Sequence, residues 1–244
     1  MGVVPPAAQG VNKRLAWETA VPFKDRSDAG RKLAAVLTSY KDQRPVVLAL
    51  PRGGVPIAAE ICAVLNAPLD LILVRKIGVP IQPELAMGAV VDGGQPIVVR
   101  NEDVIALASI DESEFKRVCD GELAEIDSRR QRYLGGRQRA DISGRTAIVV
   151  DDGVATGATT RAALRATRMR NPKRLVLAVP VAPTVTVAEL RREADDVICL
   201  EDHEFLGAIG AYYADFSQVS DEQVVDILKQ FPVQRLKDAS QPVA

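Results

Sequence analysis

Two neighbouring carboxylates, Asp151 and Asp152, are followed at once by a turn rich in glycine and threonine. The backbone N–H groups of residues 156–160 and the threonine hydroxyls among them are donors that can converge on a phosphate at the start of a helix. Carboxylates repel phosphate, so their presence suits a ligand that also carries hydroxyl groups or a metal ion. The segment therefore predicts a site for a sugar phosphate, with the phosphate at one end and the sugar hydroxyls at the other.

A strand, a turn and a helix have to position these groups. Residues 148–150 are β-branched and apolar, which is typical of a buried strand, so the carboxylates fall at its C-terminal end. Gly153 and Gly157 permit a tight turn, and residues 158–169 have helical composition. Aspartates that simply cap the helix and face solvent are the alternative interpretation of this segment alone.

Two other phosphate-binding motifs are disfavoured. A nucleotide P-loop would have lysine directly after its last glycine, whereas Ala158 follows Gly157. A dinucleotide-binding fold would have a Gly-x-Gly-x-x-Gly run after a strand, and the sequence has none.

A second loop suited to anions follows the strand expected over residues 46–50. It reads Pro-Arg-Gly-Gly-Val-Pro, with Arg52 as the cation and with Gly53 and Gly54 allowing the backbone close to a bulky ligand. In a parallel sheet this loop lies on the same edge as the carboxylates. A plain strand-to-helix turn with an exposed arginine is the alternative.

A third candidate is the pair Arg75 and Lys76 at the end of the strand expected over residues 69–74. Beside a bound phosphate these cations would neutralise charge, whereas an isolated pair at a strand end is usually solvated. Residues 77–88 contain glycines and prolines without clear periodicity, which predicts a mobile loop.

The segment Val149-Val-Asp-Asp-Gly-Val-Ala-Thr-Gly-Ala-Thr159 resembles the phosphoribosyl pyrophosphate (PRPP) signature of the type I phosphoribosyltransferases. The resemblance implies transfer of a 5-phosphoribosyl group from Mg-PRPP to a nitrogen nucleophile, with release of pyrophosphate. It assigns catalysis to Arg52, Arg75, Lys76, Asp151 and Asp152. It assigns PRPP binding to Arg52, Gly53, Gly54, Asp151, Asp152, Gly153, Ala155, Thr156, Gly157, Ala158, Thr159 and Thr160.

The cofactor implied by the resemblance is Mg²⁺, held by Asp151 and Asp152 through bound water. Residues 77–88 resemble the flexible loop of the family that closes over the substrate, with Glu84 as a candidate acceptor contact. Residues 205–215 are similar to the segment that covers the base in purine enzymes, which would bring Phe205 and Asp215 to the acceptor. A small satellite core is the alternative for these aromatic residues.

One departure from the family limits the acceptor. In the enzymes for 6-oxopurines an acid stands three residues after the second carboxylate and exchanges a proton with the purine, whereas this chain has Ala155. We therefore expect an acceptor other than a 6-oxopurine. A catalytically silent regulator that binds PRPP or a nucleotide with the same fold is the alternative function. A purely structural protein would make three anion-suited loops a coincidence.

The expected fold is α/β, with a doubly wound, mostly parallel sheet, a small hood and a helical insertion. We expect a flexible tail over residues 1–20 and a single domain over 21–244, with the insertion at 100–140 and the hood segment at about 203–244. The further strands are expected at 146–150, 175–179 and 197–200, and the further helices at 29–40, 57–65 and 187–192. Ser27 and Asp28 would cap the first helix.

The insertion combines a hairpin and a helix. Residues 89–91 and 97–99 flank Asp92-Gly93-Gly94, which predicts an antiparallel hairpin. Residues 111–133 place apolar side chains at helical spacing among charges, which indicates a helix for packing or for dimer contact.

Composition excludes several classes of protein. The 244 residues are 47% hydrophobic with a formal net charge of -1, so a nucleic-acid partner is not expected. No apolar run is long enough to span a membrane. Cys62, Cys119 and Cys199 lie far apart, which indicates reduced thiols rather than a metal cluster. We therefore expect a cytoplasmic homodimer whose partners are PRPP and a small-molecule acceptor.

Overall fold

The computed structural model describes residues 21–92 and 96–233. The expected tail over residues 1–20 and the last part of the expected hood segment lie outside these ranges. Within them, β1 (Val46–Ala49), β2 (Leu69–Leu71), β6 (Thr146–Val150), β7 (Arg174–Pro183) and β8 (Asp196–His203) form a sheet in the order β2-β1-β6-β7-β8. Every neighbouring pair is parallel. The doubly wound parallel sheet expected from the sequence is therefore confirmed.

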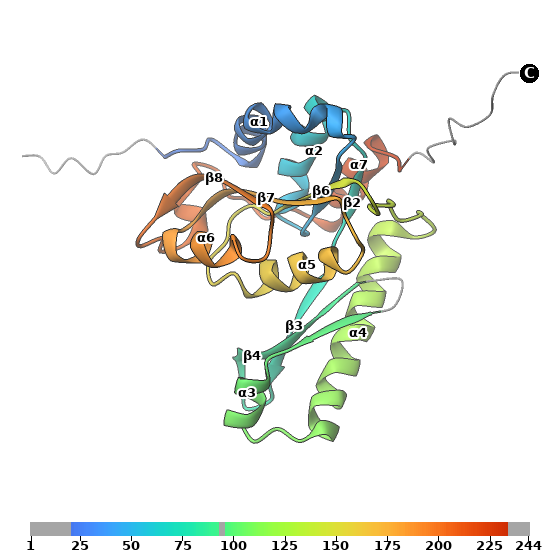
Figure 1. Cartoon of the computed structure of the whole chain (residues 1–244), viewed down its shortest axis with the longest axis vertical. Helices are drawn as coiled ribbons and strands as arrows, with labels where there is room; N and C mark the ends of the chain where they lie inside the picture. Colours follow the sequence, from blue (N-terminus) through green and yellow to red (C-terminus); the bar gives the residue numbers. More distant parts are fainter. Residues whose placement is uncertain (1–20, 93–95, 234–244) are drawn as a thin grey trace, which may run out of the picture.

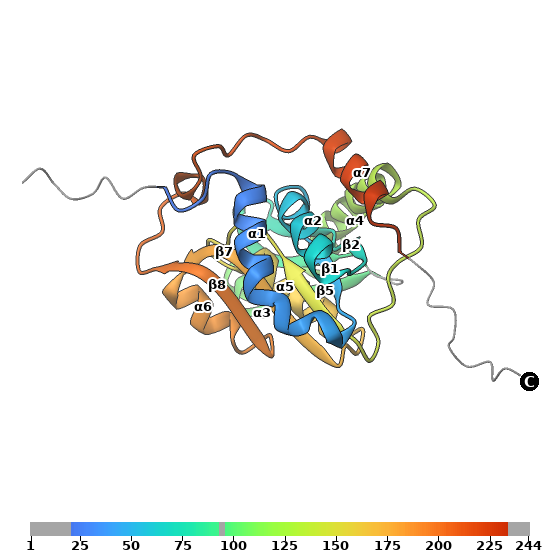
Figure 2. The same cartoon turned by 90° about the horizontal axis from the view of Figure 1, so that it is seen from above.

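Helices cover both faces of this sheet (Figures 1 and 2). On one face α1 (Arg26–Val36) and α2 (Gly54–Leu65) pack against alternate strand residues such as Val47 and Ile148. On the other face α5 (Ala158–Arg168) and α6 (Thr184–Leu190) pack against the intervening residues such as Leu48 and Val149. Successive side chains of a strand point to opposite faces, so a strand covered on both sides is apolar throughout.

The first helix begins one residue earlier than the expected cap. Asp25 is the N-cap of α1, and its Oδ1 accepts a hydrogen bond of 2.7 Å from the backbone N–H of Asp28. The prediction of Ser27-Asp28 as the cap was wrong because Asp25 makes the same kind of bond from outside the helix. The helix also ends at Val36 and continues as the 3₁₀ helix η1 (Leu37–Gln43).

A small antiparallel unit projects from the core (Figure 1). It consists of β3 (Val74–Val79), β4 (Gln82–Val91) and β5 (Ile97–Arg100), followed by α3 (Glu102–Leu107) and α4 (Glu112–Leu134). The predicted hairpin is confirmed by the pairing of Val91 with Ile97, and the predicted helix is α4. Phe115, Cys119 and Ile126 of α4 are buried, which supports its role as a packing helix.

Two expectations for this region were wrong. Residues 69–74 do not form one strand, because β2 ends at Leu71 and the chain then enters the antiparallel sheet at Val74. Residues 77–88 are not a loop without secondary structure, because most of them belong to β3 and β4, which pair as a hairpin. The glycines and prolines serve the hairpin: Gly78 lies against the backbone of Pro83, where a side chain would have no room.

The described part of the C-terminal segment runs from β8 past the start of α1 to α7 (Asp221–Gln230), as Figure 2 shows. It includes the short 3₁₀ helix η2 (Ile209–Tyr212). Phe23 connects the C-terminal segment to the N-terminal segment. The Phe23 N–H donates to Tyr212 O at 3.1 Å, and the Phe23 carbonyl accepts a hydrogen bond from Ala214 N–H at 2.9 Å. Residues 212–214 of the C-terminal segment thus pair with the start of the described chain.

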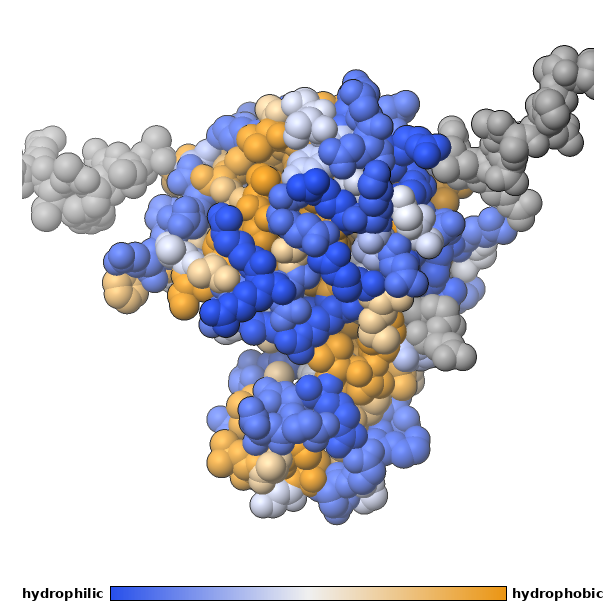
Figure 3. Space-filling model, in the orientation of Figure 1, coloured by the Kyte–Doolittle hydropathy of each residue, from blue (hydrophilic) through white to orange (hydrophobic). Residues whose placement is uncertain are grey.

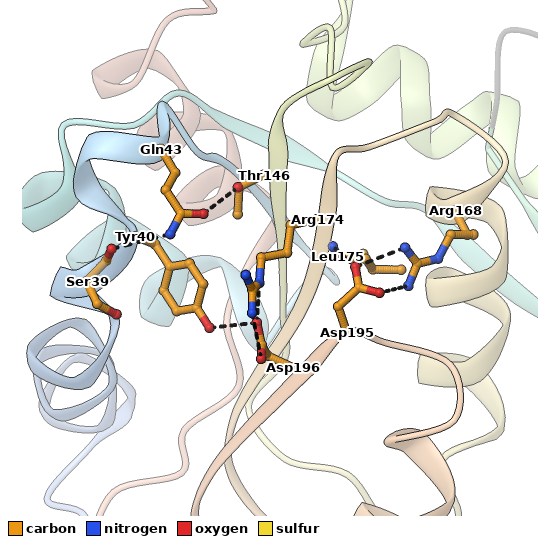
Figure 4. Close-up of polar contacts among 9 residues, drawn as sticks. All are labelled: Ser39, Tyr40, Gln43, Thr146, Arg168, Arg174, Leu175, Asp195 and Asp196. Atoms are coloured by element: carbon orange, nitrogen blue, oxygen red, sulfur yellow. Dashed lines mark hydrogen bonds and ion pairs between the residues drawn. The ribbon is translucent and has the colours of Figure 1, made fainter.

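Polar contacts connect the N-terminal ends of the strands, at the other end of the sheet from the motif (Figure 4). Asp196 accepts a hydrogen bond of 2.9 Å from the Tyr40 hydroxyl and pairs with Arg174 through both carboxylate oxygens. Asp195 pairs in the same way with Arg168 at the end of α5. These contacts connect the start of β8 to β7, η1 and α5.

Two further sequence expectations can be compared with the structure. Cys62, Cys119 and Cys199 are free thiols. No helix within the described ranges is both long enough and apolar enough to cross a bilayer.

Candidate active site

The Pro51–Gly54 loop and the Asp151–Gly157 turn lie side by side. Strands β1 and β6 are neighbours, and Leu50 N–H donates to Val150 O at 2.9 Å just before both chains turn. The strand order reverses at this point, which is where ligands bind in open α/β sheets. The structure therefore brings the first two anion-suited loops to one crevice.

Contact between the two loops requires glycine. A Cβ atom on Gly53 would lie 1.9 Å from Oδ2 of Asp152, and one on Gly54 would lie 2.5 Å from Val150 O. Gly53 thus leaves room for a carboxylate, and Gly54 leaves room for the neighbouring strand. The peptide bond between Pro51 and Arg52 is cis.

Asp152 is held by groups distant in the sequence. Arg26 Nε donates a hydrogen bond of 2.8 Å to its Oδ2, and Arg26 Nη2 forms an ion pair with the same oxygen at 2.7 Å. The hydroxyl of Tyr213 donates to its carbonyl at 2.6 Å. Sequence reasoning did not identify Arg26, because an ion pair across 126 positions leaves no local pattern.

Asp151 faces a different environment. Its Oδ1 accepts a hydrogen bond of 2.9 Å from Asp152 N–H. It lines a cavity of about 60 Å³ with Arg75, Arg129 and Thr159. Burial and then the charge of Asp152 hold the pKa of Asp151 well above its ordinary value. Burial also raises the pKa of Asp152, against the opposing effect of the Arg26 hydrogen bond.

The expected phosphate nest lies at the start of α5. Gly157 is its N-cap with φ of +75°, and no side chain caps the helix, so the N–H groups of its first turn are available to a ligand. Thr156, Ala158 and Thr159 line a groove of about 460 Å³ that also contains Lys76. Figure 3 shows the narrow waist where the core meets the projecting unit.

Two residues of the expected nest, Thr160 and Ala155, contact other parts of the molecule. Thr160 is only 3% exposed, whereas Thr156 and Thr159 are exposed, so Thr160 is the least accessible of the three threonines. Helical geometry explains this, because Thr160 packs with the buried face of α5. Ala155 is exposed, and its carbonyl accepts a hydrogen bond of 3.0 Å from Thr186.

The three candidate cations are all paired with acids. Arg75 and Lys76 lie within β3, opposite Val90 and Ala89 of β4. Their expected place at the tip of a parallel strand was wrong, because the chain changes sheets before them.

Because consecutive strand residues point to opposite faces, Arg75 reaches the cavity with Asp151 and Lys76 reaches the groove with Thr156. Arg75 Nε also contacts Glu122 at 2.7 Å, and Lys76 Nζ contacts Glu84 at 3.3 Å. Arg52 Nη1 lies 3.5 Å from Asp221 of α7.

The candidate acceptor residues are not gathered in one place. The Glu84 side chain is 96% exposed and pairs with Lys76. Phe205 is 91% exposed. Asp215 accepts a hydrogen bond of 2.9 Å from Ser217 N–H. The satellite core is formed instead by Phe23, Tyr213 and Phe216, with ring centroids 5.3 and 5.0 Å apart.

The two aspartates suit a Mg²⁺ ion that is bound together with substrate phosphates rather than by protein side chains alone. No group of three or more acidic, histidine or cysteine side chains in the described part of the chain gathers to hold a metal. Mg²⁺ commonly binds through one or two carboxylates together with substrate phosphates, so a full protein cage is not required. Asp152 Oδ2 is already engaged by a hydrogen bond and an ion pair from Arg26, so the protein by itself offers few free carboxylate oxygens here. The donor set therefore fits a metal ion that arrives with the phosphates.

Comparison with known proteins identifies the family. The phosphoribosyl transferase domain family matches residues 24–216. The chain belongs to this family. A Mycobacterium tuberculosis protein provisionally named a phosphoribosyl transferase is 45% identical over 206 residues, which are 84% of this chain and 46% of that protein. The chain thus spans about half the length of the curated relatives it matches.

A solved structure agrees with this assignment. The crystal structure of TT1426 from Thermus thermophilus is 41% identical with a TM-score of 0.76, covering 86% of this chain and 99% of that one. The molecule therefore has the α/β fold of the type I phosphoribosyltransferases, with a mostly parallel sheet and flanking helices.

Proposed function

We propose that this phosphoribosyl transferase moves a 5-phosphoribosyl group from Mg-PRPP to a nitrogen nucleophile and releases pyrophosphate. The main support for the proposal is that three features lie at one crevice: the Asp151–Asp152 pair, the N-terminus of α5, which no side chain caps, and the loop with Gly53 and Gly54. A sugar phosphate needs carboxylates for its hydroxyls and N–H donors for its phosphate.

The roles follow from position. Residues 155–160 hold the 5-phosphate, mainly through backbone N–H groups, and Asp151 and Asp152 hold the ribose hydroxyls directly or through metal-bound water. Bound Mg²⁺ supplies positive charge to the pyrophosphate. Arg75 stands in the same cavity as Asp151, where it neutralises charge that develops as pyrophosphate leaves.

Two cations have to exchange partners before they act. Lys76 is paired with the exposed Glu84 of the hairpin, and Arg52 makes only a long contact with Asp221. Exposed ion pairs are worth about 0–1 kcal/mol, so a bound pyrophosphate can take both cations. The β3–β4 hairpin would close over the substrate and exclude water.

The acceptor belongs to a class other than the 6-oxopurines. Ala155 offers no carboxylate for proton exchange with such a base. Phe205 and Asp215 remain the proposed acceptor contacts, and the exposure of Phe205 leaves its ring free to stack on an incoming base. A homodimer in cytoplasmic nucleotide metabolism is part of the same proposal.

The test is pyrophosphate release from Mg-PRPP across a panel of nitrogen bases and amines. We expect release with at least one acceptor, and we expect Asp151→Asn to reduce it by ~100-fold or more, as loss of a ligand-positioning group does. The matched control is Asp120→Asn, since Asp120 is an exposed acid of α4 paired with Lys116. Full activity of Asp151→Asn would overturn the assignment. PRPP binding without release with any acceptor would favour the regulator instead.

A further inference from the structure

Arg26 joins three parts of the molecule at the second carboxylate of the motif. It is the first residue of α1, its Nε donates to Asp152 Oδ2, with Nη2 paired to the same oxygen, and its Nη1 donates to Ser217 O at 2.7 Å. Its guanidinium also lies over the ring of Phe216, 3.9 Å from the centroid. The N-terminal helix, the motif and the C-terminal segment therefore meet on one side chain.

The contact with Arg26 holds the Asp152 carboxylate through only one of its two oxygens. Arg26 Nε and Nη2 both contact Oδ2, and no donor from another described residue forms a hydrogen bond with Oδ1. On its other side the carboxylate lies against Gly53. It is thus confined between a guanidinium and a backbone, with one oxygen left for another donor.

The pair is largely removed from water. The side chains of Arg26 and Asp152 are 11% and 15% exposed. Such a pair adds little stability over apolar residues of the same size, because desolvation offsets the attraction between the charges. Its placement on the motif carboxylate is therefore better explained by the orientation it imposes than by the stability it adds.

We propose that Arg26 is a positioning residue, which orients the Asp152 carboxylate so that Oδ1 accepts a hydroxyl of the ribose. This inference rests on the proposed function. The C-terminal segment shares the task, because Phe216 and Ser217 hold the guanidinium in place.

The test compares Arg26→Met and Arg26→Lys with Arg31→Met. Arg31 lies on the same helix, but its side chain is 55% exposed and its acidic contacts are at 3.4 and 3.9 Å. We expect Arg26→Met to lower kcat/KM for PRPP by about 10- to 100-fold, because a small displacement of a positioning group costs that much. Arg26→Lys should restore part of the loss, and Arg31→Met should change little.

A double-mutant cycle with Asp152→Asn separates positioning from a general effect on the fold. If Arg26 acts through Asp152, the double variant should be no worse than Asp152→Asn alone. If Arg26 only stabilises the fold, the two losses should multiply. Thermal melts of each variant check that the protein is folded, and Phe216→Leu, which leaves the ion pair intact, should give a smaller loss in the same direction.

The outcomes distinguish the two proposals. A wild-type protein that neither binds nor consumes PRPP overturns the proposed function, and this inference with it. An active wild type in which Arg26→Met matches Arg31→Met, or in which the losses with Asp152→Asn multiply, overturns only the role of Arg26.

Discussion

Replacing Gly53 by alanine should lower the free energy of unfolding, because the added methyl group collides with the Asp152 side chain. The backbone of Gly53 has φ of -63° and ψ of -34°, which alanine adopts without strain. The three atoms nearest to the added Cβ all belong to the carboxyl group of Asp152, the closest at 1.9 Å. The carboxylate must therefore rotate away, and it then loses the hydrogen bond and the ion pair with Arg26.

The net effect is the difference of two terms. Losing hydrogen bonds to a charged group costs about 1.5–3 kcal/mol. Replacing glycine by alanine at a compatible backbone position returns about 0.4–1 kcal/mol through the unfolded chain. The expected net loss is about 1–2 kcal/mol, which in a domain of this size lowers Tm by about 2–8 °C.

Thermal melts in two backgrounds provide the assay. In the wild-type background Gly53→Ala should lower Tm, whereas in an Asp152→Gly background, where the obstructing carboxyl group is gone, the same change should raise Tm. Gly121→Ala is the control, since its added Cβ meets nothing within 4 Å in the middle of α4, and it should stabilise by about 0.5–1 kcal/mol. An equal Tm change from Gly53→Ala in both backgrounds would refute the reasoning.

Two further predictions concern the turn and the sheet edge. Gly157→Ala should destabilise the protein more than Gly144→Ala. Both glycines have positive φ, which costs alanine about 1–2 kcal/mol, but only at Gly157 does the added Cβ lie 2.9 Å from Thr186. Equal losses of stability in urea melts would show that this contact is harmless. Arg174, and then Tyr40, hold the pKa of Asp196 below its ordinary 3.8, so its stabilising effect is present above that value and is lost as pH falls through the folded-state pKa. The stability advantage of the wild type over Asp196→Asn should therefore shrink as the pH falls below about 4, and an advantage independent of pH would contradict this.

The strand-turn-helix around the motif was predictable because each of its signals is local. An apolar β-branched run, two acids and two glycines specify β6, the turn and α5 without reference to the rest of the chain. The glycine loop after β1 was placed correctly beside it, since adjacent parallel strands end at the same edge.

The rest depended on contacts between distant segments. The run Leu69–Val74 is apolar throughout, and nothing in it marks the point where the chain leaves one sheet for another. The expected positions of Arg75 and Lys76 were therefore wrong, although from β3 Arg75 reaches the cavity with Asp151 and Lys76 reaches the groove with Thr156. Arg26 was missed for a related reason, because its importance comes only from a partner 126 residues away.

The most direct test of the central claim needs no knowledge of the acceptor. Calorimetric titration of PRPP with Mg²⁺ should show binding at one site per chain in the wild type and in Asp120→Asn. The same titration should show binding weakened by ~100-fold or more in Asp151→Asn, as expected when a ligand-positioning carboxylate is lost. No binding by the wild type, or equal binding by Asp151→Asn, would contradict the placement of PRPP at this crevice.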